Sequence, residues 1–278
     1  IIVLTDFNKT LTLPTSSTSF STIRKTGLLP DEYKVKAEEL YDEYRPYELG
    51  EKGESDEECR AKLKEWWKKH FDLMIEYKLS FKMIQSIARD TQLIHMREGF
   101  KEFFDFLYKD LIPLKIISAG LGDLIIEILL KEDSFTTSLE VFSNFFEFDE
   151  KGIAIARNSR TVIDTLNKEI NLELIEKTYV IVMGDCIEDL RVLSKLKYEE
   201  VLKIGFLVDE SKRAGISLLG SRDNVYSKNV RRDFKFTNFT VENTGDSIIF
   251  TDSLGRTHTQ KPGGEHQRTN SVYDLNPD

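Results

Sequence analysis

The sequence predicts an α/β protein: a parallel sheet carries helices on both faces, and an α-helical cap is inserted after the first strand. Short apolar runs alternate with helical patterns from residue 97 to residue 208, an order typical of parallel strands that are buried on both faces. Before this region lie one apolar strand, residues 1–4, and a charged helical block, residues 31–95. The helical block is therefore expected to cover the sheet.

Three helices are predicted in the cap. The first begins at Pro30 and Asp31 and ends at Pro46, because proline suits the start of a helix but not its interior. The second covers residues 55–79 and the third covers residues 81–95. The second helix has one apolar face at spacings of three and four, formed by Leu63, Trp66, Trp67, Phe71 and Met74.

The core is predicted to alternate strands and helices. After the first strand, the predicted helices cover residues 98–110, 122–131, 159–170 and 187–196. The predicted strands cover residues 114–118, 139–143, 178–185 and 201–208. Because these strands are short and almost wholly apolar, we expect helices to cover both of their faces.

Residues 211–278 form a divergent C-terminal segment that is rich in Ser, Thr, Asn and Gly. Residues 233–240 alternate apolar and polar positions, and residues 246–253 are a second short strand candidate. About the last 20 residues are typical of loop or disorder. The chain therefore divides into a core of residues 1–12 and 97–210, a cap of residues 13–96, and this segment.

Composition excludes several functional classes. The 278 residues, 40% of them hydrophobic, are enough to bury a large core. No apolar run approaches the roughly 18 residues of a membrane span, and no signal peptide is visible, so we expect a cytoplasmic protein without a membrane partner. A net charge of −9 argues against binding to a nucleic acid polymer. Two cysteines, Cys59 and Cys186, are too few for a disulfide framework.

Polar residues end three of the predicted strands. Asp6 follows the first strand, Ser118 ends the second, and Asp185 ends the strand at residues 178–185. In open α/β sheets, ligands bind beyond the carboxyl ends of the strands. Any one of these residues alone is more often a helix cap or part of a solvated turn. Together they indicate a functional site.

The motifs around these residues resemble those of haloacid-dehalogenase-like (HAD-like) phosphatases. DFNKTLT, from Asp6, resembles the first motif, DxDxT, and IISAG, with Ser118, resembles the second. LNKE, with Lys168, resembles the third, and GDCIEDL, with Asp185 and Asp189, resembles the fourth. Longer blocks such as IPLKIISAGLGDLIIEIL, VFSNFFEFDEKGI and MGDCIEDLRVL are similar to the cytosolic pyrimidine 5′-nucleotidase (type III) family over roughly the first 210 residues.

This resemblance implies a Mg²⁺-dependent phosphomonoester hydrolase with a small phosphorylated substrate, a nucleoside monophosphate. Asp6 would be the nucleophile and would form an aspartyl phosphate. Lys168 would neutralise both Asp6 and the transferring phosphoryl group. The implied Mg²⁺ ligands are Asp6, the backbone oxygen of Asn8, Asp185 and, directly or through water, Asp189. The implied phosphate-binding residues are Thr10, Ser118, Ala119, Gly120 and Lys168.

Some of these residues also have a purely structural interpretation. Lys168 could be a solvated charge on a helix, and Asp189 could be a surface residue of the helix that follows Asp185. In the cap, the resemblance matches Glu65 to a carboxylate that binds a nucleobase edge and Phe71 to an aromatic ring that stacks on the base. Phe71 at helical spacing equally suits a core position. Asp123 is expected to cap the helix that follows it.

Asn8 departs from the family pattern. The family has Asp at this position, where the side chain protonates the leaving oxygen and then activates water. An amide cannot do this at neutral pH, and loss of a general acid/base typically costs about 10² to 10⁴ in rate. Lys9 is a second departure, because the relatives carry an uncharged residue there.

Several alternatives stay open at the level of sequence. Asn8 is either an engineered substitution or natural in a catalytically weak or silent relative that binds a nucleotide or a protein partner. Slow transfer from a good leaving group, and phosphotransfer to a nucleoside acceptor, are further hypotheses. The exact substrate and the oligomeric state are not determined by these patterns.

Overall fold

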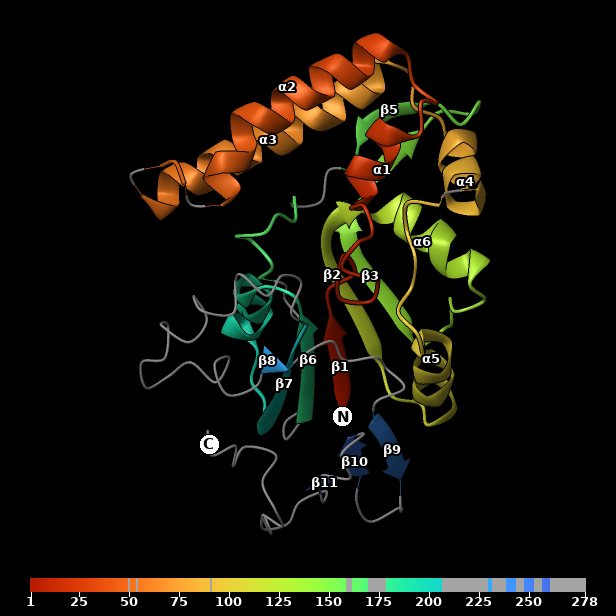
Figure 1. Cartoon of the computed structure of the whole chain (residues 1–278), viewed down its shortest axis with the longest axis vertical. Coiled ribbons are helices and arrows are strands. Elements are labelled where there is room, and N and C mark those ends of the chain that lie inside the picture. The colour runs from red at the N-terminus through yellow and green to blue at the C-terminus, as the bar shows by residue number, and fades with distance from the viewer. Residues whose placement is uncertain are drawn as a thin grey trace.

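The computed structural model describes residues 1–206 apart from 50, 54, 91, 159–161 and 170–178, together with residues 230–231, 239–243, 248–252 and 257–260. Its centre is a parallel sheet with the strand order β3-β2-β1-β6-β7-β8 (Figure 1). Its strands are β1 (Ile2–Thr5), β2 (Leu114–Leu121), β3 (Leu139–Asn144), β6 (Tyr179–Gly184), β7 (Glu200–Phe206) and β8 (Val230–Arg231).

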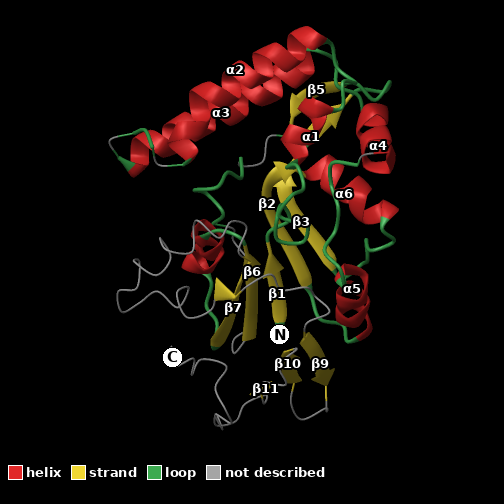
Figure 2. Ribbon diagram, in the orientation of Figure 1, coloured by secondary structure: helices red, strands yellow, loops and turns green. Residues whose placement is uncertain are grey.

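Helices cover both faces of the sheet. Because successive side chains of a strand point to opposite faces, Val3 packs on one side of β1 and Leu4 on the other. Val3 belongs to the cluster that contains α5 (Phe100–Lys109) and α6 (Gly122–Lys131), which Figure 2 shows beside β2 and β3. Leu4 belongs to the cluster beneath η1 (Ile187–Lys195), on the other face. The predicted fold class is confirmed.

β1 lies inside the sheet between β2 and β6. Val3 pairs with Leu114 on one side and with Ile181 on the other, and both pairings are parallel. The carboxyl ends of the three strands therefore lie at one edge of the sheet. Residues that follow these strands are brought together there, although more than a hundred positions separate Asp6 from the residues that follow β2 and β6.

The described part of the segment between β1 and α5 contains four helices. They are α1 (Ser19–Lys25), α2 (Asp31–Glu48), α3 (Asp56–Glu76) and α4 (Phe81–Asp90). Figure 1 shows α2 and α3 as a long pair lying beyond the ends of the strands. Tyr44 and Trp66 join this pair through nearly parallel rings, whose centroids are 6.2 Å apart.

The chain passes from core to cap and back again through two segments that run side by side. Thr12 and Met96 form an antiparallel bridge, and the Arg97 N–H donates to the Leu11 carbonyl at 2.9 Å. The guanidinium of Arg97, itself buried, donates to the carbonyls of Lys9 and Thr10 at 2.7 Å each. Arg97 therefore ties the loop after β1 to the start of the returning chain.

A hairpin that the sequence did not predict attaches the other end of the cap. It consists of β4 (Phe146–Phe148) and β5 (Ala154–Arg157). The Ala154 N–H donates to the Leu79 carbonyl at 2.9 Å, and the Phe71 and Phe146 rings lie 4.7 Å apart. Asp123 does not cap α6; its carboxylate accepts the Phe146 N–H at 3.0 Å and so fixes the hairpin to the core.

The helix expected at residues 159–170 is wrong over residues 162–169, the part that the structure describes. This stretch is a loop with a turn at residues 165–166. The Asn144 side chain accepts the Ile163 N–H at 3.0 Å and donates to the Ile163 carbonyl at 2.7 Å. Both backbone groups of Ile163 are therefore bonded to a side chain and not to other residues of a helix. Asp164 then accepts the Leu166 N–H at 2.8 Å, as in an Asx turn.

Other helical boundaries also differ from expectation. Pro46 does not end α2, which continues to Glu48. The proline removes one hydrogen bond to the Asp42 carbonyl, and water can satisfy that carbonyl because Asp42 is exposed. The short helix α1 was not predicted, α4 ends at Asp90, and the element at Ile187–Lys195 is a 3₁₀ helix.

The C-terminal segment contributes short strands to the described part of the chain. β9 (Phe239–Asn243), β10 (Ile248–Asp252) and β11 (Thr257–Gln260) form an antiparallel sheet in the order β11-β10-β9. β10 lies within the candidate strand at residues 246–253. Most of the candidate at residues 233–240, and the expected disorder at the C-terminus, fall outside the described residues. None of the helices in the described ranges is long and apolar enough to cross a membrane.

Replacing Arg97 by Met should lower the free energy of unfolding by about 2–4 kcal/mol, because it leaves two carbonyls without their charged donor. Urea denaturation measures this. The matched control is Lys101→Met, which removes an exposed ion pair with Asp105 and should leave the free energy of unfolding nearly unchanged. Equal losses in the two variants would contradict the role given to Arg97.

Candidate active site

Asp6 lies at the end of β1, where its N–H continues the sheet by donating to the Met183 carbonyl at 3.0 Å. The Lys168 ammonium donates to Asp6 Oδ1 at 2.8 Å and to Asp189 Oδ1 at 2.5 Å. Asp6, Lys168 and Asp189 are all buried, with exposures of 6%, 3% and 4%. The structure therefore joins three of the predicted site residues, and Lys168 is not a solvated charge.

Asp189 reaches this contact through the turn before η1. Its second carboxylate oxygen accepts the Cys186 N–H at 3.0 Å, which fixes the start of the 3₁₀ helix. A side chain at Gly184 would collide with Asp189, so glycine is required there by close approach. Asp185 and Asp189 do not share a helix face, because Asp185 precedes η1, yet ligand atoms of Asp185, Cys186 and Asp189 lie within 4.8 Å of one another.

The charges of this cluster leave an excess of carboxylate. Burial raises the pKa of Asp6 to about 6, against the opposing charge of Lys168. Burial, together with the charges of Asp189 and Asp6, raises the pKa of Asp185 to about 8. Three carboxylates thus surround one buried ammonium. Oxygen ligands and an excess of negative charge fit a hard divalent cation such as Mg²⁺.

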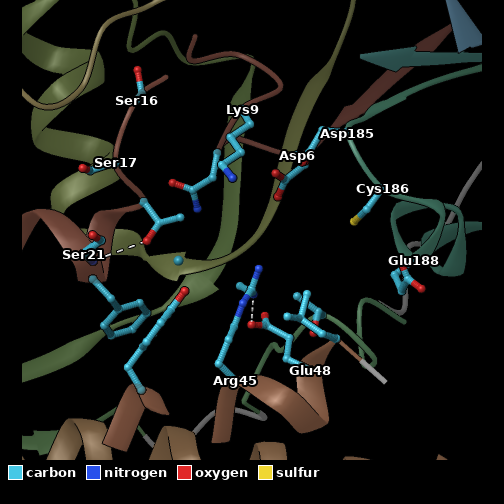
Figure 3. Close-up of a pocket in the computed structure, with 18 of the residues that line it drawn as sticks. Asp6, Lys9, Ser16, Ser17, Ser21, Arg45, Glu48, Asp185, Cys186 and Glu188 are labelled. Carbon is cyan, nitrogen blue, oxygen red and sulfur yellow. Dashed lines mark hydrogen bonds and ion pairs between the residues drawn. The ribbon is translucent and has the colours of Figure 1, made fainter. Parts of the chain in front are cut away.

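A cavity of about 750 Å³ opens between this cluster and the cap. Figure 3 shows Asp6, Lys9 and Asp185 on the core side, with Arg45 and Glu48 of α2 pointing toward them from the cap. Among the predicted residues, those that line the cavity are Asp6, Asn8, Ala119, Gly120, Lys168 and Asp185.

Thr10 and Ser118 lie behind the cavity wall. Thr10 is fully buried, and its hydroxyl donates to Asp185 at 3.4 Å. The Ser118 hydroxyl, also fully buried, accepts the Gly120 N–H at 3.1 Å. Neither lines the cavity; Thr10 supports Asp185 and Ser118 supports Gly120 through these hydrogen bonds.

The loop that carries Asn8 and Lys9 is held in an uncommon conformation. Lys9 has a φ of 62°, in the left-handed region that non-glycine residues seldom adopt. Its N–H donates to the Thr12 hydroxyl at 2.7 Å. The Asn8 side-chain oxygen accepts the Ser19 N–H at 3.3 Å, so the amide is anchored at the start of α1. A carboxylate at position 8 could accept the same bond.

Aromatic residues of the cap form the opposite wall. Trp66, Trp67 and His70 of α3 line the cavity, and the two indole rings lie 5.7 Å apart with an interplanar angle of 17°. Both ring nitrogens of His70 and the indole nitrogen of Trp66 are buried without a hydrogen-bond partner among the described residues. Burial and the charge of Arg24 lower the pKa of His70 to about 4, so the ring is neutral near pH 7.

Glu65 and Phe71 do not line the cavity. Glu65 accepts the Tyr44 hydroxyl at 2.7 Å and pairs with Lys69 at 2.9 Å, on another side of α3. Phe71 is 1% exposed and packs into the core. The sequence missed Arg45, Glu48, Trp67 and His70 as cavity residues. The available signal was the polar His70 on an otherwise apolar helix face.

Comparison with known proteins gives a consistent assignment. The family model for pyrimidine 5′-nucleotidase (UMPH-1) matches residues 6–234. The chain is 30% identical over 237 residues to 7-methylguanosine phosphate-specific 5′-nucleotidase A of Xenopus laevis, covering 80% of this chain and 81% of that protein. It is 29% identical to the corresponding human protein, covering 83% and 81%.

A solved structure supports the same assignment. The crystal structure of cytosolic 5′-nucleotidase IIIB bound to cytidine superposes with a TM-score of 0.65 at 27% identity, and the match covers 77% of this chain and 76% of that one. The family model spans most of the chain, including Asp6, Lys168 and Asp185. The chain therefore belongs to the pyrimidine 5′-nucleotidase family of HAD-like phosphatases, and its relatives are enzymes.

Proposed function

We propose that this chain is a Mg²⁺-dependent nucleotidase that transfers the phosphoryl group of a nucleoside 5′-monophosphate to Asp6 and then to water. The observation that carries the proposal is the position of the buried Asp6–Lys168 pair, which faces an aromatic wall across one cavity. A phosphate and a base can be held at opposite ends of such a cavity. The substrates named for the relatives, 7-methylguanosine phosphate, and the cytidine of the solved structure support it.

In the proposed reaction, an oxygen of Asp6 attacks phosphorus and the bond to the nucleoside 5′ oxygen breaks. Lys168 favours the ionised form of Asp6 and neutralises charge on the transferring group. Ala119 and Gly120 line the cavity where the phosphoryl oxygens would lie. Water then attacks the aspartyl phosphate and regenerates Asp6.

The proposed Mg²⁺ ligands are Asp6, Asp185 and the backbone oxygen of Asn8, with Asp189 binding directly or through water. When bound, the ion would neutralise the substrate phosphate and hold it against the nucleophile. Thr10 supports this site through its hydrogen bond to Asp185.

Both chemical steps require a proton to move near position 8. The leaving oxygen must gain a proton, and the attacking water must lose one. The Asn8 amide lines the cavity but cannot serve as acid or base at neutral pH. We therefore propose that this chain retains the nucleophile and the cation site while its turnover is impaired.

A second candidate function follows from Asn8 alone. A chain that lacks the proton carrier but keeps the cavity could bind a nucleotide without hydrolysing it. The two functions differ in turnover and not in binding. The cytosol is the proposed compartment for either, in keeping with the names of the cytosolic relatives.

Replacing Asn8 by Asp should raise phosphate release from nucleoside monophosphates by about 10² to 10⁴, because it supplies the missing general acid/base. The Ser19 N–H can bond the new carboxylate, so the loop should keep its geometry. Steady-state phosphate release with Mg²⁺ across a panel of nucleotides measures the change. Asp6→Asn should abolish release in either background. No turnover in the Asn8→Asp protein would contradict the enzymatic proposal and favour the binding function.

Metal binding should be visible in the pH dependence of stability. The pKa of Asp185 is raised in the folded protein, so protonation of Asp185 stabilises the fold at low pH, and this contribution is lost as the pH rises through about 8. The Tm of the metal-free protein should therefore fall between pH 6 and pH 9. Mg²⁺ should raise the Tm more at pH 9, where Asp185 is ionised.

Thermal unfolding with EDTA and with Mg²⁺ at both pH values tests this expectation. Asp185→Asn is the informative variant, because it removes both the titrating group and a proposed ligand. Its Tm should depend less on pH and should not respond to Mg²⁺. A wild-type Tm that Mg²⁺ leaves unchanged at pH 9 would argue against the proposed cation site.

A further inference from the structure

The cap side of the cavity is predominantly cationic. Among the described residues that line the cavity, the cap contributes Arg24, Lys25 and Arg45 as cations and Glu48 as an anion. Arg24 lies close enough to the aromatic wall for its charge to lower the pKa of His70, and its guanidinium is 4.8 Å from the centre of the Tyr41 ring. The positive charges therefore lie beside the wall where a base would stack.

The one carboxylate on this side is already paired. Arg45 and Glu48 lie one turn apart on α2, and the Arg45 guanidinium donates to the Glu48 carboxylate. The two side chains are 33% and 13% exposed, so the pair is partly shielded from water. Figure 3 shows both rising from α2 into the cavity, with the contact between them drawn. The charge of Glu48 is thereby largely neutralised.

We propose that the Arg45–Glu48 ion pair makes this cavity select an uncharged nucleobase over a cationic base such as 7-methylguanine. The inference rests on the proposed function, because it assumes that a base occupies the aromatic end. A base that carries a positive charge would meet the charge of Arg24, and Glu48 could not balance that charge without leaving Arg45. An uncharged base can accept hydrogen bonds from Arg45 with no such repulsion.

The pair acts on specificity and not on the reacting atoms. Specificity is a difference between two affinities, and a like-charge contact against one ligand is sufficient to create it. Removing the Arg45 charge would leave Glu48 as an unpaired, partly buried carboxylate that attracts a cation. The preference should then move toward the cationic base.

Nucleoside binding tests this without requiring turnover, a phosphate or a metal. The probes are guanosine and 7-methylguanosine, which differ by one methyl group and by the positive charge of the methylated base, together with cytidine. Binding is measured by quenching of tryptophan fluorescence, because Trp66 and Trp67 line the cavity, and by calorimetry. The variants are Arg45→Gln and Glu48→Gln. The control is Arg89→Gln, which removes the same charge from an exposed position on α4.

The wild-type protein should bind guanosine more tightly than 7-methylguanosine. Arg45→Gln should shift the ratio of the two dissociation constants toward 7-methylguanosine by about tenfold. Glu48→Gln should weaken 7-methylguanosine further, and Arg89→Gln should leave the ratio unchanged. Circular dichroism and Tm confirm that each variant is folded.

The outcomes separate this inference from the proposed function. If the wild-type protein binds nucleosides but already prefers 7-methylguanosine, or if Arg45→Gln leaves the ratio unchanged, the ion pair does not set specificity and the proposed function stands. If the wild-type protein binds none of the three nucleosides, the aromatic end does not hold a base, and both proposals are overturned.

Discussion

The buried ammonium of Lys168 holds the site together. It bonds Asp6 at the end of β1 and Asp189 in the first turn of η1, and its charge balances these two buried carboxylates. Because Lys168 lies on a loop, its position depends on that loop, which Asn144 fixes by pairing with both backbone groups of Ile163. A contact network that begins in β3 thus determines where the ammonium meets Asp6.

The cap is attached to the core at several places, and these attachments define the cavity. They include the Thr12–Met96 crossing with the Arg97 guanidinium, the β4–β5 hairpin, and the hydrogen bond from the Leu121 N–H to the Ser19 hydroxyl. Together they present the aromatic face of α3 to the edge of the sheet. A wall held in place in this way orients a bound substrate at little additional entropic cost.

Asn8 and the Arg45–Glu48 pair affect the chemistry and charge of the cavity, but they do not determine how the cap is attached to the core. The Asn8 amide accepts the Ser19 N–H, which a carboxylate could also do, so the proposed effect of asparagine at this position is on proton transfer alone. Arg45 similarly contributes to the charge that the cap presents to the cavity, and α2 does not depend on this side chain for its backbone conformation. In our proposals, turnover and base preference are set by a few side chains that line one cavity.

The sequence by itself determined the α/β class and the helical segment after the first strand, because strand and helix periodicity are local properties of the chain. The resemblance of its motifs to those of a known family also predicted that Asp6, Lys168, Asp185 and Asp189 lie together. The sequence misplaced the helix around Lys168, because the side-chain bonds of Asn144 that replace a helix come from a distant strand. It also assigned Thr10, Ser118, Glu65 and Phe71 to substrate contacts. Only the tertiary structure decided whether each of these side chains faces the cavity or is buried by its neighbours, because that depends on how the cap packs against the core.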